Sequence, residues 1–285
     1  MSLAALAASF ALALMTPQQK AELLVVSGLP APPGVGGVFV SRFTRSLPRP
    51  AGALVFADQE GGRVRSFPDL PPRRDARDYE TTADAFLAGR ATAAALPRAG
   101  VAVDLAPVLD LADGPLGFRQ FRRPELGVAF ARGLGRHACV KHFPGLGTAA
   151  VSTDDRPHVD AVLRARDLAP FRAAIRAGVP CVMVNHAFYR RFGPYRASTE
   201  PGTYRLLRSL GFGGVAITDS FSIVSRPPTV LWTRRAVLGG ADLVLYTSPH
   251  DAAVAIDALV PLARRGLLDE HVARVLAFRQ MIERQ

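Results

Sequence analysis

Short apolar runs recur along the chain, and amphipathic stretches separate several of them. Eight apolar runs predict strands, at 23–27, 37–40, 53–57, 101–108, 138–142, 181–185, 214–218 and 242–246. Apolar residues at helical spacing predict helices at 82–99, 125–134, 165–177, 202–210, 252–264 and 268–284. Because near-continuous apolar strands are typical of a parallel sheet covered on both faces, this alternation favours an α/β fold.

The number of strand units favours one particular architecture within that class. Eight units in 285 residues fit a single (β/α)₈ TIM-type barrel better than an open doubly wound sheet. The connection at 28–36 is the least regular part of the pattern. The helix at 268–284 is expected to close the barrel, with Asp269 as its cap. No linker, repeat or low-complexity tract divides the chain, so residues 16–285 are assigned to one barrel.

Residues 1–15 form an N-terminal apolar extension. The stretch 3–14 contains a small-residue pattern that resembles a cleavage site, yet no Lys or Arg precedes it. It is too short to span a bilayer as a helix, so no membrane span is expected. An extra helix packed on the barrel, the remnant of a leader and sequence added for expression all fit. We expect a cytoplasmic protein, or an exported one if the stretch is a leader remnant.

The chain is strongly basic, with a net charge of +11, and 49% of its residues are apolar. Lys20 and Lys141 are the only lysines, so nearly all of the positive charge is arginine. These arginines are spread through predicted helices and loops, and no nucleic-acid motif accompanies them. The composition therefore favours solvated helix faces over a nucleic-acid-binding surface.

Cysteine and motif content argue against a redox or metal centre. Cys139 and Cys181 each lie inside an apolar strand pattern, which favours buried free thiols over a disulfide or a metal site. The sequence contains no metal-spaced His/Cys/Asp set, no glycine-rich phosphate loop and no nucleotide fingerprint. We therefore expect no cofactor and no metal.

Charged clusters follow three of the predicted strands. Asp58 to Arg63 follow the run at 53–57, Lys141 and His142 end the run at 138–142, and Asp219 follows the run at 214–218. A parallel barrel gathers the carboxyl ends of its strands into one mouth. These groups are therefore expected to meet in a single cleft together with Arg119.

Five motifs occur in an order that resembles a known family. They are Asp-Gln-Glu-Gly-Gly-Arg-Val at 58–64, Ala-Pro-Val-Leu-Asp at 106–110, Lys-His-Phe-Pro-Gly at 141–145, Met-Val-Asn-His at 183–186 and Thr-Asp-Ser at 218–220. Together they resemble glycoside hydrolase family 3, and its single-domain bacterial β-N-acetylglucosaminidase branch in particular. The resemblance extends from about residue 15 to the C-terminus.

The resemblance implies a retaining glycoside hydrolase with Asp219 as its nucleophile. Such an enzyme needs a carboxylate on one face of the anomeric carbon and a proton donor for the leaving oxygen. An alternative for Asp219 is the N-cap of the segment that follows it. The residues that the resemblance assigns to substrate binding are Asp58, Arg63, Arg119, Lys141, His142 and His186.

For two of the charged residues, a structural role is the alternative to a role in substrate binding. Lys141 comes directly after an apolar run, so it is expected to be buried beside a ligand or a neighbouring carboxylate. Glu60 could contact the sugar, or it could hold Arg63 in place across the turn of Gly61 and Gly62.

The loop after Lys141 and His142 departs from the family pattern. The resembling enzymes have Asp-Ser-His in this loop, with a histidine as acid/base, but here Ser152 and Asp154 stand at the positions of the Asp and His. Asp154 could serve as a carboxylic acid donor if its pKa is raised. His158 is the alternative donor. A third reading is that Asp154 and Asp155 form a turn and that activity is reduced or lost.

Three functional classes follow from these patterns. The first is an exo-β-N-acetylglucosaminidase acting on cell-wall-type amino sugars. The second is a divergent β-glycosidase or a glycoside phosphorylase with another sugar preference, and the third is a sugar-binding homologue with impaired catalysis. In each case the expected partner is a small carbohydrate and not a nucleic acid. The sequence does not indicate an oligomeric state.

Overall fold

The computed structural model describes residues 12–223 and 229–284, and these form a closed parallel barrel. Eight strands form one sheet in the order β6-β3-β2-β1-β10-β9-β8-β7, and all seven pairs of neighbouring strands are parallel. Parallel bridges from Asp104 to Ala138 and from Val108 to Lys141 join the two ends of that order. The strands therefore follow one another around the barrel in chain order, as the sequence predicted. Their bounds are β1 Val25–Ser27, β2 Gly37–Val40, β3 Leu54–Ala57, β6 Val103–Asp104, β7 Cys139–Phe143, β8 Cys181–Val184, β9 Val215–Ser220 and β10 Leu243–Tyr246.

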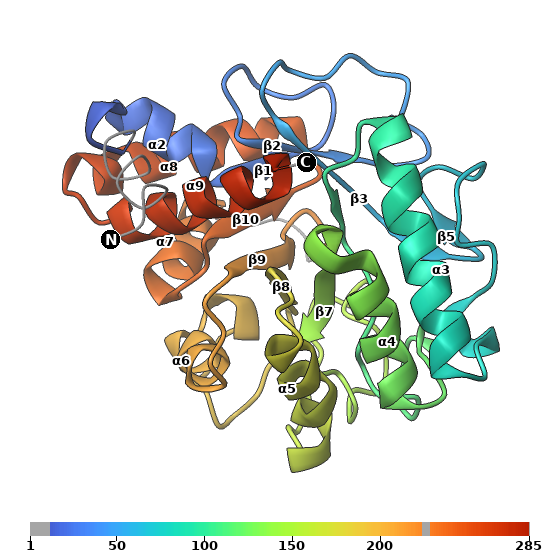
Figure 1. Ribbon diagram of the computed structural model, residues 1–285. Helices are drawn as coiled ribbons and strands as arrows, with labels where there is room; N and C mark the ends of the chain where they lie inside the picture. The colour runs from blue at the N-terminus through green and yellow to red at the C-terminus, as the bar shows by residue number, and fades with distance from the viewer. Residues whose placement is uncertain (1–11, 224–228, 285) are drawn as a thin grey trace.

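The outer layer consists of α2, which precedes β1, and of helices that follow the strands from β3 onward. Figure 1 shows α3 and α4 packed side by side, and α2 packed on α8. The connections at 28–36 and 41–53, which are fully described, contain no helix. The irregularity expected at 28–36 is therefore confirmed. The helices are α2 Pro17–Leu23, α3 Thr82–Ala95, α4 Pro124–Leu134, α5 Ala169–Arg176, α6 Pro201–Ser209, α7 Thr229–Gly239, α8 Pro249–Arg264 and α9 Asp269–Glu283.

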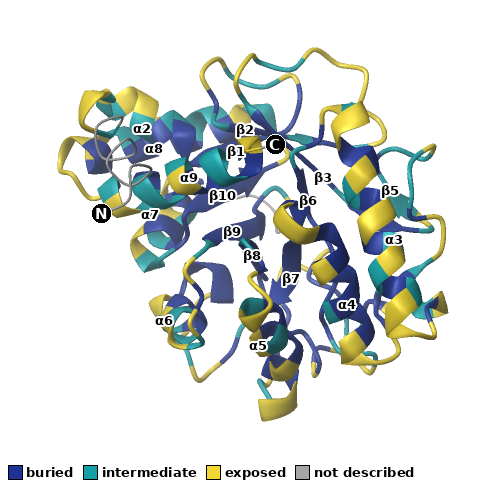
Figure 2. Cartoon of the chain, in the orientation of Figure 1, coloured by how far each residue is buried: buried dark blue, intermediate teal, exposed yellow. Residues whose placement is uncertain are grey.

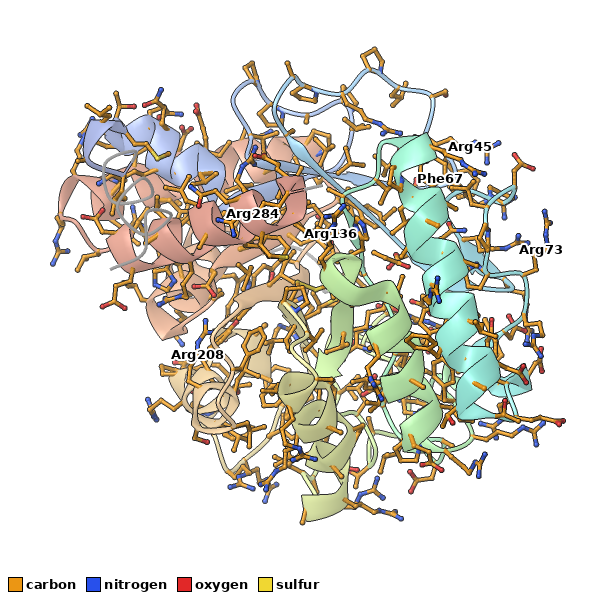
Figure 3. All side chains as sticks on the ribbon, in the orientation of Figure 1. Arg45, Phe67, Arg73, Arg136, Arg208 and Arg284 are labelled. Atoms are coloured by element: carbon orange, nitrogen blue, oxygen red, sulfur yellow. A yellow bond between two sulfur atoms is a disulfide. The ribbon has the colours of Figure 1, made fainter. Side chains whose placement is uncertain are left out.

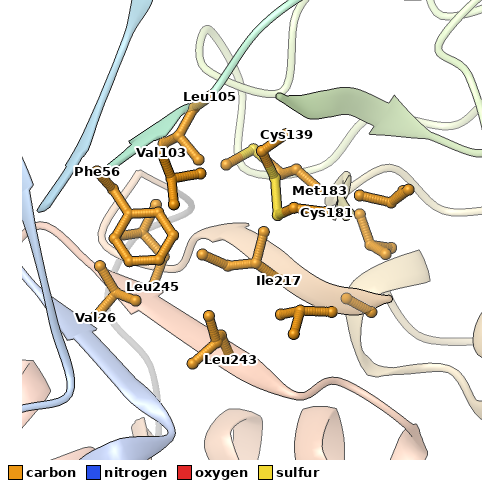
Figure 4. Close-up of a cluster of buried hydrophobic side chains, with 14 of the residues drawn as sticks. Val26, Phe56, Val103, Leu105, Cys139, Cys181, Met183, Ile217, Leu243 and Leu245 are labelled. Atoms are coloured by element: carbon orange, nitrogen blue, oxygen red, sulfur yellow. A yellow bond between two sulfur atoms is a disulfide. The ribbon is translucent and has the colours of Figure 1, made fainter. Parts of the chain in front are cut away.

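Burial explains why the strands read as continuous apolar runs. Strands β3, β8 and β10 are buried at every position, because one face points into the barrel and the other packs on helices. Figure 2 shows this buried layer inside helices whose outer faces are exposed. Figure 4 shows a cluster of these buried hydrophobic side chains packed between the strands. Those labelled are Val26, Phe56, Val103, Leu105, Cys139, Cys181, Met183, Ile217, Leu243 and Leu245.

The two cysteines are joined, so the prediction of free thiols was wrong. Cys139 and Cys181 form a disulfide, and their Cα atoms are 4.3 Å apart. They begin the neighbouring strands β7 and β8 and lie directly opposite each other in the parallel register. That register is set by the parallel pairing of β7 with β8, and a separation of 42 residues in the sequence does not reveal it.

Three features of the helical layer differ from the sequence predictions. The helices α2 and α7 were not predicted. Leu268, not Asp269, is the N-cap residue of α9. Asp269 instead forms an ion pair with Lys20 of α2, with an N–O distance of 2.7 Å. An acidic residue in the first turn still favours the helix through its dipole.

Residues 1–11, which make up most of the predicted apolar extension, lie outside the described part.

The basic charge is distributed over the surface. Figure 3 labels five arginines that lie on separate segments of the chain, namely Arg45, Arg73, Arg136, Arg208 and Arg284. Several arginines form ion pairs with carboxylates of the same chain. Arg208, for example, lies 2.6 Å from the buried Asp242. Among the described helices, none is both long enough and apolar enough to cross a bilayer.

Candidate active site

A buried cluster of charges lies where β3 and β7 end. Lys141 of β7 places its Nζ 2.6 Å from a carboxylate oxygen of Asp58 and 2.6 Å from one of Glu60. Arg119 ends a short 3₁₀ turn, Gly117–Arg119, and donates two hydrogen bonds to Glu60, at 2.8 and 2.9 Å. The side chain of Glu60 is only 5% exposed, so these charge-assisted bonds compensate for lost hydration.

Within the cluster, Glu60, Lys141 and Arg119 stay charged at neutral pH. Burial raises the pKa of Glu60, but Arg119 and Lys141 outweigh it and bring the pKa down to about 2. Burial lowers the pKa of Lys141, yet the carboxylates of Asp58 and Glu60 raise it above its ordinary value. The expected pairing of Lys141 with a neighbouring carboxylate is therefore confirmed.

The β4–β5 hairpin positions Glu60. It consists of β4 Gln59–Gly61 and β5 Val64–Arg65, and its turn residue Gly62 has φ +49°. A Cβ at Gly62 would collide with Asp75, so only glycine fits there. Asp75 also binds the guanidinium of Arg63, which stacks on Phe118 with a centroid distance of 3.6 Å.

Arg63 is therefore not held by Glu60, and that alternative was wrong. The Arg63 side chain is 65% exposed and lies outside the buried cluster. The physical reason is the turn itself, because it directs Glu60 inward to Arg119 and leaves Arg63 to Asp75.

His142 is held by a residue to which the sequence analysis gave no role. Asp110 accepts hydrogen bonds from the backbone N–H of His142 at 3.0 Å and from its Nδ1 at 2.7 Å. The other oxygen of Asp110 accepts the N–H of Leu146 at 2.7 Å. Asp110 ends the motif at 106–110 and follows the predicted strand at 101–108, so its place beyond the end of an apolar run was the available signal.

Asp219 lies in β9 and is nearly buried, with 8% exposure. Burial raises its pKa, but the imidazoles of His142 and His186 oppose this effect. The Ser220 N–H, which donates to Asp219 at 2.8 Å, and Lys141 act in the same direction as the imidazoles. The net result is a pKa below the ordinary aspartate value, so this carboxylate is ionised at neutral pH.

His186 lies beside Asp219 as a buried, neutral imidazole. Burial, reinforced by Arg196, lowers the pKa of His186 to about 4, although Asp219 acts in the opposite direction. Its Nδ1 lies 2.7 Å from the hydroxyl of Ser198. Its buried Nε2 has no hydrogen-bond partner among the residues that the structure describes.

Asp154 faces the same group of residues. Its side chain is 44% exposed and lies 3.6 Å from Arg119. Partial burial and the negative charge of Asp219 raise the pKa of Asp154, against the weaker effects of His142 and Arg119. The pKa values of Asp154 and Asp219 are thus displaced in opposite directions, which is typical of a catalytic acid and its partner carboxylate.

His158 occupies a different environment. Its ring stacks on Phe188 with a centroid distance of 4.0 Å, and its Nε2 lies 3.4 Å from Asp160. The structure therefore gathers six of the predicted site residues around the mouth, with His186 next to Asp219, and places Arg63 and His158 at exposed positions. The six are Asp58, Arg119, Lys141, His142, Asp154 and Asp219. Within the described ranges, no group of three or more His, Cys, Asp or Glu side chains could hold a metal ion.

Fold and site together define a TIM-type barrel protein with a carboxylate-rich site at the carboxyl ends of its strands. The chain matches the model of the glycosyl hydrolase family 3 N-terminal domain over residues 42–278. The chain therefore belongs to this family, which confirms the resemblance.

Individual relatives support the same placement. A beta-hexosaminidase of Stenotrophomonas maltophilia (strain K279a) is 36% identical over 210 residues, which cover 63% of this chain and 61% of that protein. The structure of a family 3 beta-N-acetylglucosaminidase from Paenibacillus sp. str. FPU-7 matches with a TM-score of 0.83 and 26% identity, over 94% of this chain and 63% of that one. A family 3 glycosyl hydrolase from Mycobacterium smegmatis str. MC2 155 matches with a TM-score of 0.80 and 26% identity, over 94% and 98% of the two chains. The present chain thus spans about three fifths of the length of the curated relative.

Proposed function

We propose that this protein is a retaining exo-β-N-acetylglucosaminidase that acts on cell-wall-type amino sugars. The observation that carries the proposal is the pair Asp219 and Asp154, whose pKa values are shifted apart at one barrel mouth. The names of the relatives, a beta-hexosaminidase and a beta-N-acetylglucosaminidase, support the choice of sugar.

In this mechanism Asp219 attacks the anomeric carbon and forms a glycosyl-enzyme intermediate. Its lowered pKa keeps it ionised and therefore nucleophilic. Asp154 donates a proton to the leaving oxygen and then removes one from the water that releases the sugar. A raised pKa retains the proton that this role requires.

The buried cluster supplies the sugar contacts. Asp58 is 30% exposed, so an oxygen that is not used by Lys141 is available to accept a sugar hydroxyl. Lys141 and Arg119 are fixed by Glu60, and they donate to hydroxyl or acetamido oxygens without first having to become ordered. His142 and His186 donate hydrogen bonds to the sugar, or accept them from it, on the side of the site where Asp219 lies.

The test is turnover of 4-nitrophenyl N-acetyl-β-glucosaminide compared with the matching β-glucoside, with and without inorganic phosphate. We expect faster release of nitrophenol from the N-acetyl substrate, no effect of phosphate, and β-configured N-acetylglucosamine as the first product by NMR. A sugar phosphate as the product would instead identify a phosphorylase. If neither substrate is turned over, sugar binding without catalysis is the role that remains.

A further inference from the structure

A cavity of about 710 Å³ lies between two loops at the carboxyl ends of β7 and β8. Its walls come from Thr148 and residues 160–163 on one side and from residues 188–191 on the other. None of the residues assigned to sugar binding or catalysis lines it. Its size is within the range of small-molecule sites.

The walls of the cavity are largely apolar. Val162 contributes a side chain that is 69% exposed, which is unusual for valine, and Phe188 and Leu163 lie beside it. The Phe188 ring stacks on His158 and lies 5.0 Å from the guanidinium carbon of Arg196, and the Phe188 backbone pairs with Asp160. A ligand with a flat apolar body therefore gains contact area without ordering this wall.

The charge at the rim is positive. Arg190 and Arg191 line the cavity, and both are exposed. Neither forms an ion pair with a carboxylate in the part of the chain that the structure describes. The one acidic residue of the lining, Asp160, lies 3.4 Å from His158. Two guanidinium groups beside an apolar wall match a ligand that carries a carboxylate.

The loop that forms one wall also carries Asp154. Thr148 closes the base of this loop, because its hydroxyl donates to the carbonyl of Val162 at 3.0 Å. The N–H of Ala161 donates to the carbonyl of Phe188 at 2.9 Å. A ligand in the cavity would therefore contact Thr148 and Val162, which close this loop, and Ala161 and Phe188, which attach it to the loop after β8.

We infer that this cavity is a second ligand site, separate from the sugar site, and that it binds a small aromatic carboxylate. The apolar wall of Val162 and Phe188 holds the body of the ligand, and Arg190 and Arg191 bind its carboxylate. The inference concerns binding alone, so it stands whether or not the chain hydrolyses glycosides.

Calorimetric titration of the full chain with 1-naphthylacetate tests this site, and the uncharged 1-naphthylacetamide is the matched probe. We expect the carboxylate to bind about tenfold more tightly than the amide. Arg190→Ala combined with Arg191→Ala should remove that difference. Arg172→Ala, which changes an exposed arginine of α5, should retain it.

Two further variants locate the binding. Val162→Glu should abolish binding by placing a carboxylate in the cavity, whereas Leu87→Glu, at a position of α3 that is 57% exposed, should not. Asp58→Asn should leave the Kd unchanged, because the site is separate from the sugar cluster. Absence of binding to the wild type, equal binding of acid and amide, or loss of binding in Asp58→Asn would each overturn the inference.

Discussion

Asp110 holds His142 through two hydrogen bonds, one to its backbone N–H at 3.0 Å and one to its Nδ1 at 2.7 Å. The carboxylate is fully buried, with a side-chain exposure of 0%. Because Nδ1 is held by a carboxylate, Nε2 is the ring nitrogen left to face the site. Asp110 is therefore a positioning residue for His142 and, through Leu146, for the start of the loop that carries Asp154.

We expect Asp110→Ala to lower kcat/KM for aryl N-acetyl-β-glucosaminides by about 10²-fold, because His142 loses its fixed orientation. Asp110→Asn retains one acceptor oxygen and should recover part of that loss. Steady-state kinetics combined with thermal unfolding separates the two possible causes. Equal loss of activity in both variants, in proportion to a lower Tm, would indicate a purely structural role.

Replacing the proposed nucleophile should stop catalysis without harming the fold. Asp219→Asn retains the size of the side chain but cannot attack the anomeric carbon, so kcat should fall by roughly three orders of magnitude or more. The Tm should change little, since the amide still accepts the Ser220 N–H. Asp155→Asn, at a neighbouring exposed carboxylate of the loop after β7, is the control. An unchanged kcat in Asp219→Asn would exclude the nucleophile role.

Asp154→Asn should show its effect through the leaving group. Protonation matters most when the leaving oxygen is basic, so the variant should be roughly 10²-fold or more slower on alkyl glycosides and nearly normal on 2,4-dinitrophenyl glycosides. His158→Ala should behave like wild type on both substrates, because its ring lies against Phe188. If His158→Ala shows the dependence and Asp154→Asn does not, histidine is the donor.

The pH profile of kcat/KM should be bell-shaped, with its maximum on the acidic side of neutrality. Activity rises with pH as Asp219 ionises, and its lowered pKa shifts that limb below the ordinary aspartate value of 3.8. Activity falls as Asp154 loses its proton, and its raised pKa places that limb above 3.8. Asp154→Asn should remove the basic limb. If this variant retained the basic limb, another group would be responsible for it.

Glu60→Gln should destabilise the fold by about 3–5 kcal/mol at neutral pH, because it leaves Arg119 and Lys141 short of a buried counter-charge. The pKa of Glu60 is lowered from 4.5 to about 2, so its contribution is complete above pH 4.5 and is lost as the pH falls from 4.5 towards 2. Urea unfolding across this range should show a shallower pH dependence in the variant. Glu125→Gln, at an exposed glutamate near Arg123, should change neither quantity.

Much of the barrel could be predicted from the sequence, because burial on both faces leaves a local mark. Strands such as β8 and β10 are buried at every position and appear in the chain as continuous apolar runs. Asp58, Lys141 and Asp219 could be assigned to the mouth for the same reason, since each lies at or just beyond the end of such a run. The helix α7 was missed, since 229–239 mixes apolar residues with threonine and arginine and shows no clear helical spacing.

The order of strands and helices, and the charged residues that lie at the ends of strands, could be predicted from the sequence, because these depend on neighbours along the chain. The partners of these residues follow from the three-dimensional fold. It joined Glu60 to Arg119, His142 to Asp110 and Cys139 to Cys181, across 59, 32 and 42 residues of chain. Such pairs depend on barrel closure and on the paths of loops over the mouth. The same closure places Asp154 near the charge of Asp219, and its raised pKa follows from that proximity and from partial burial.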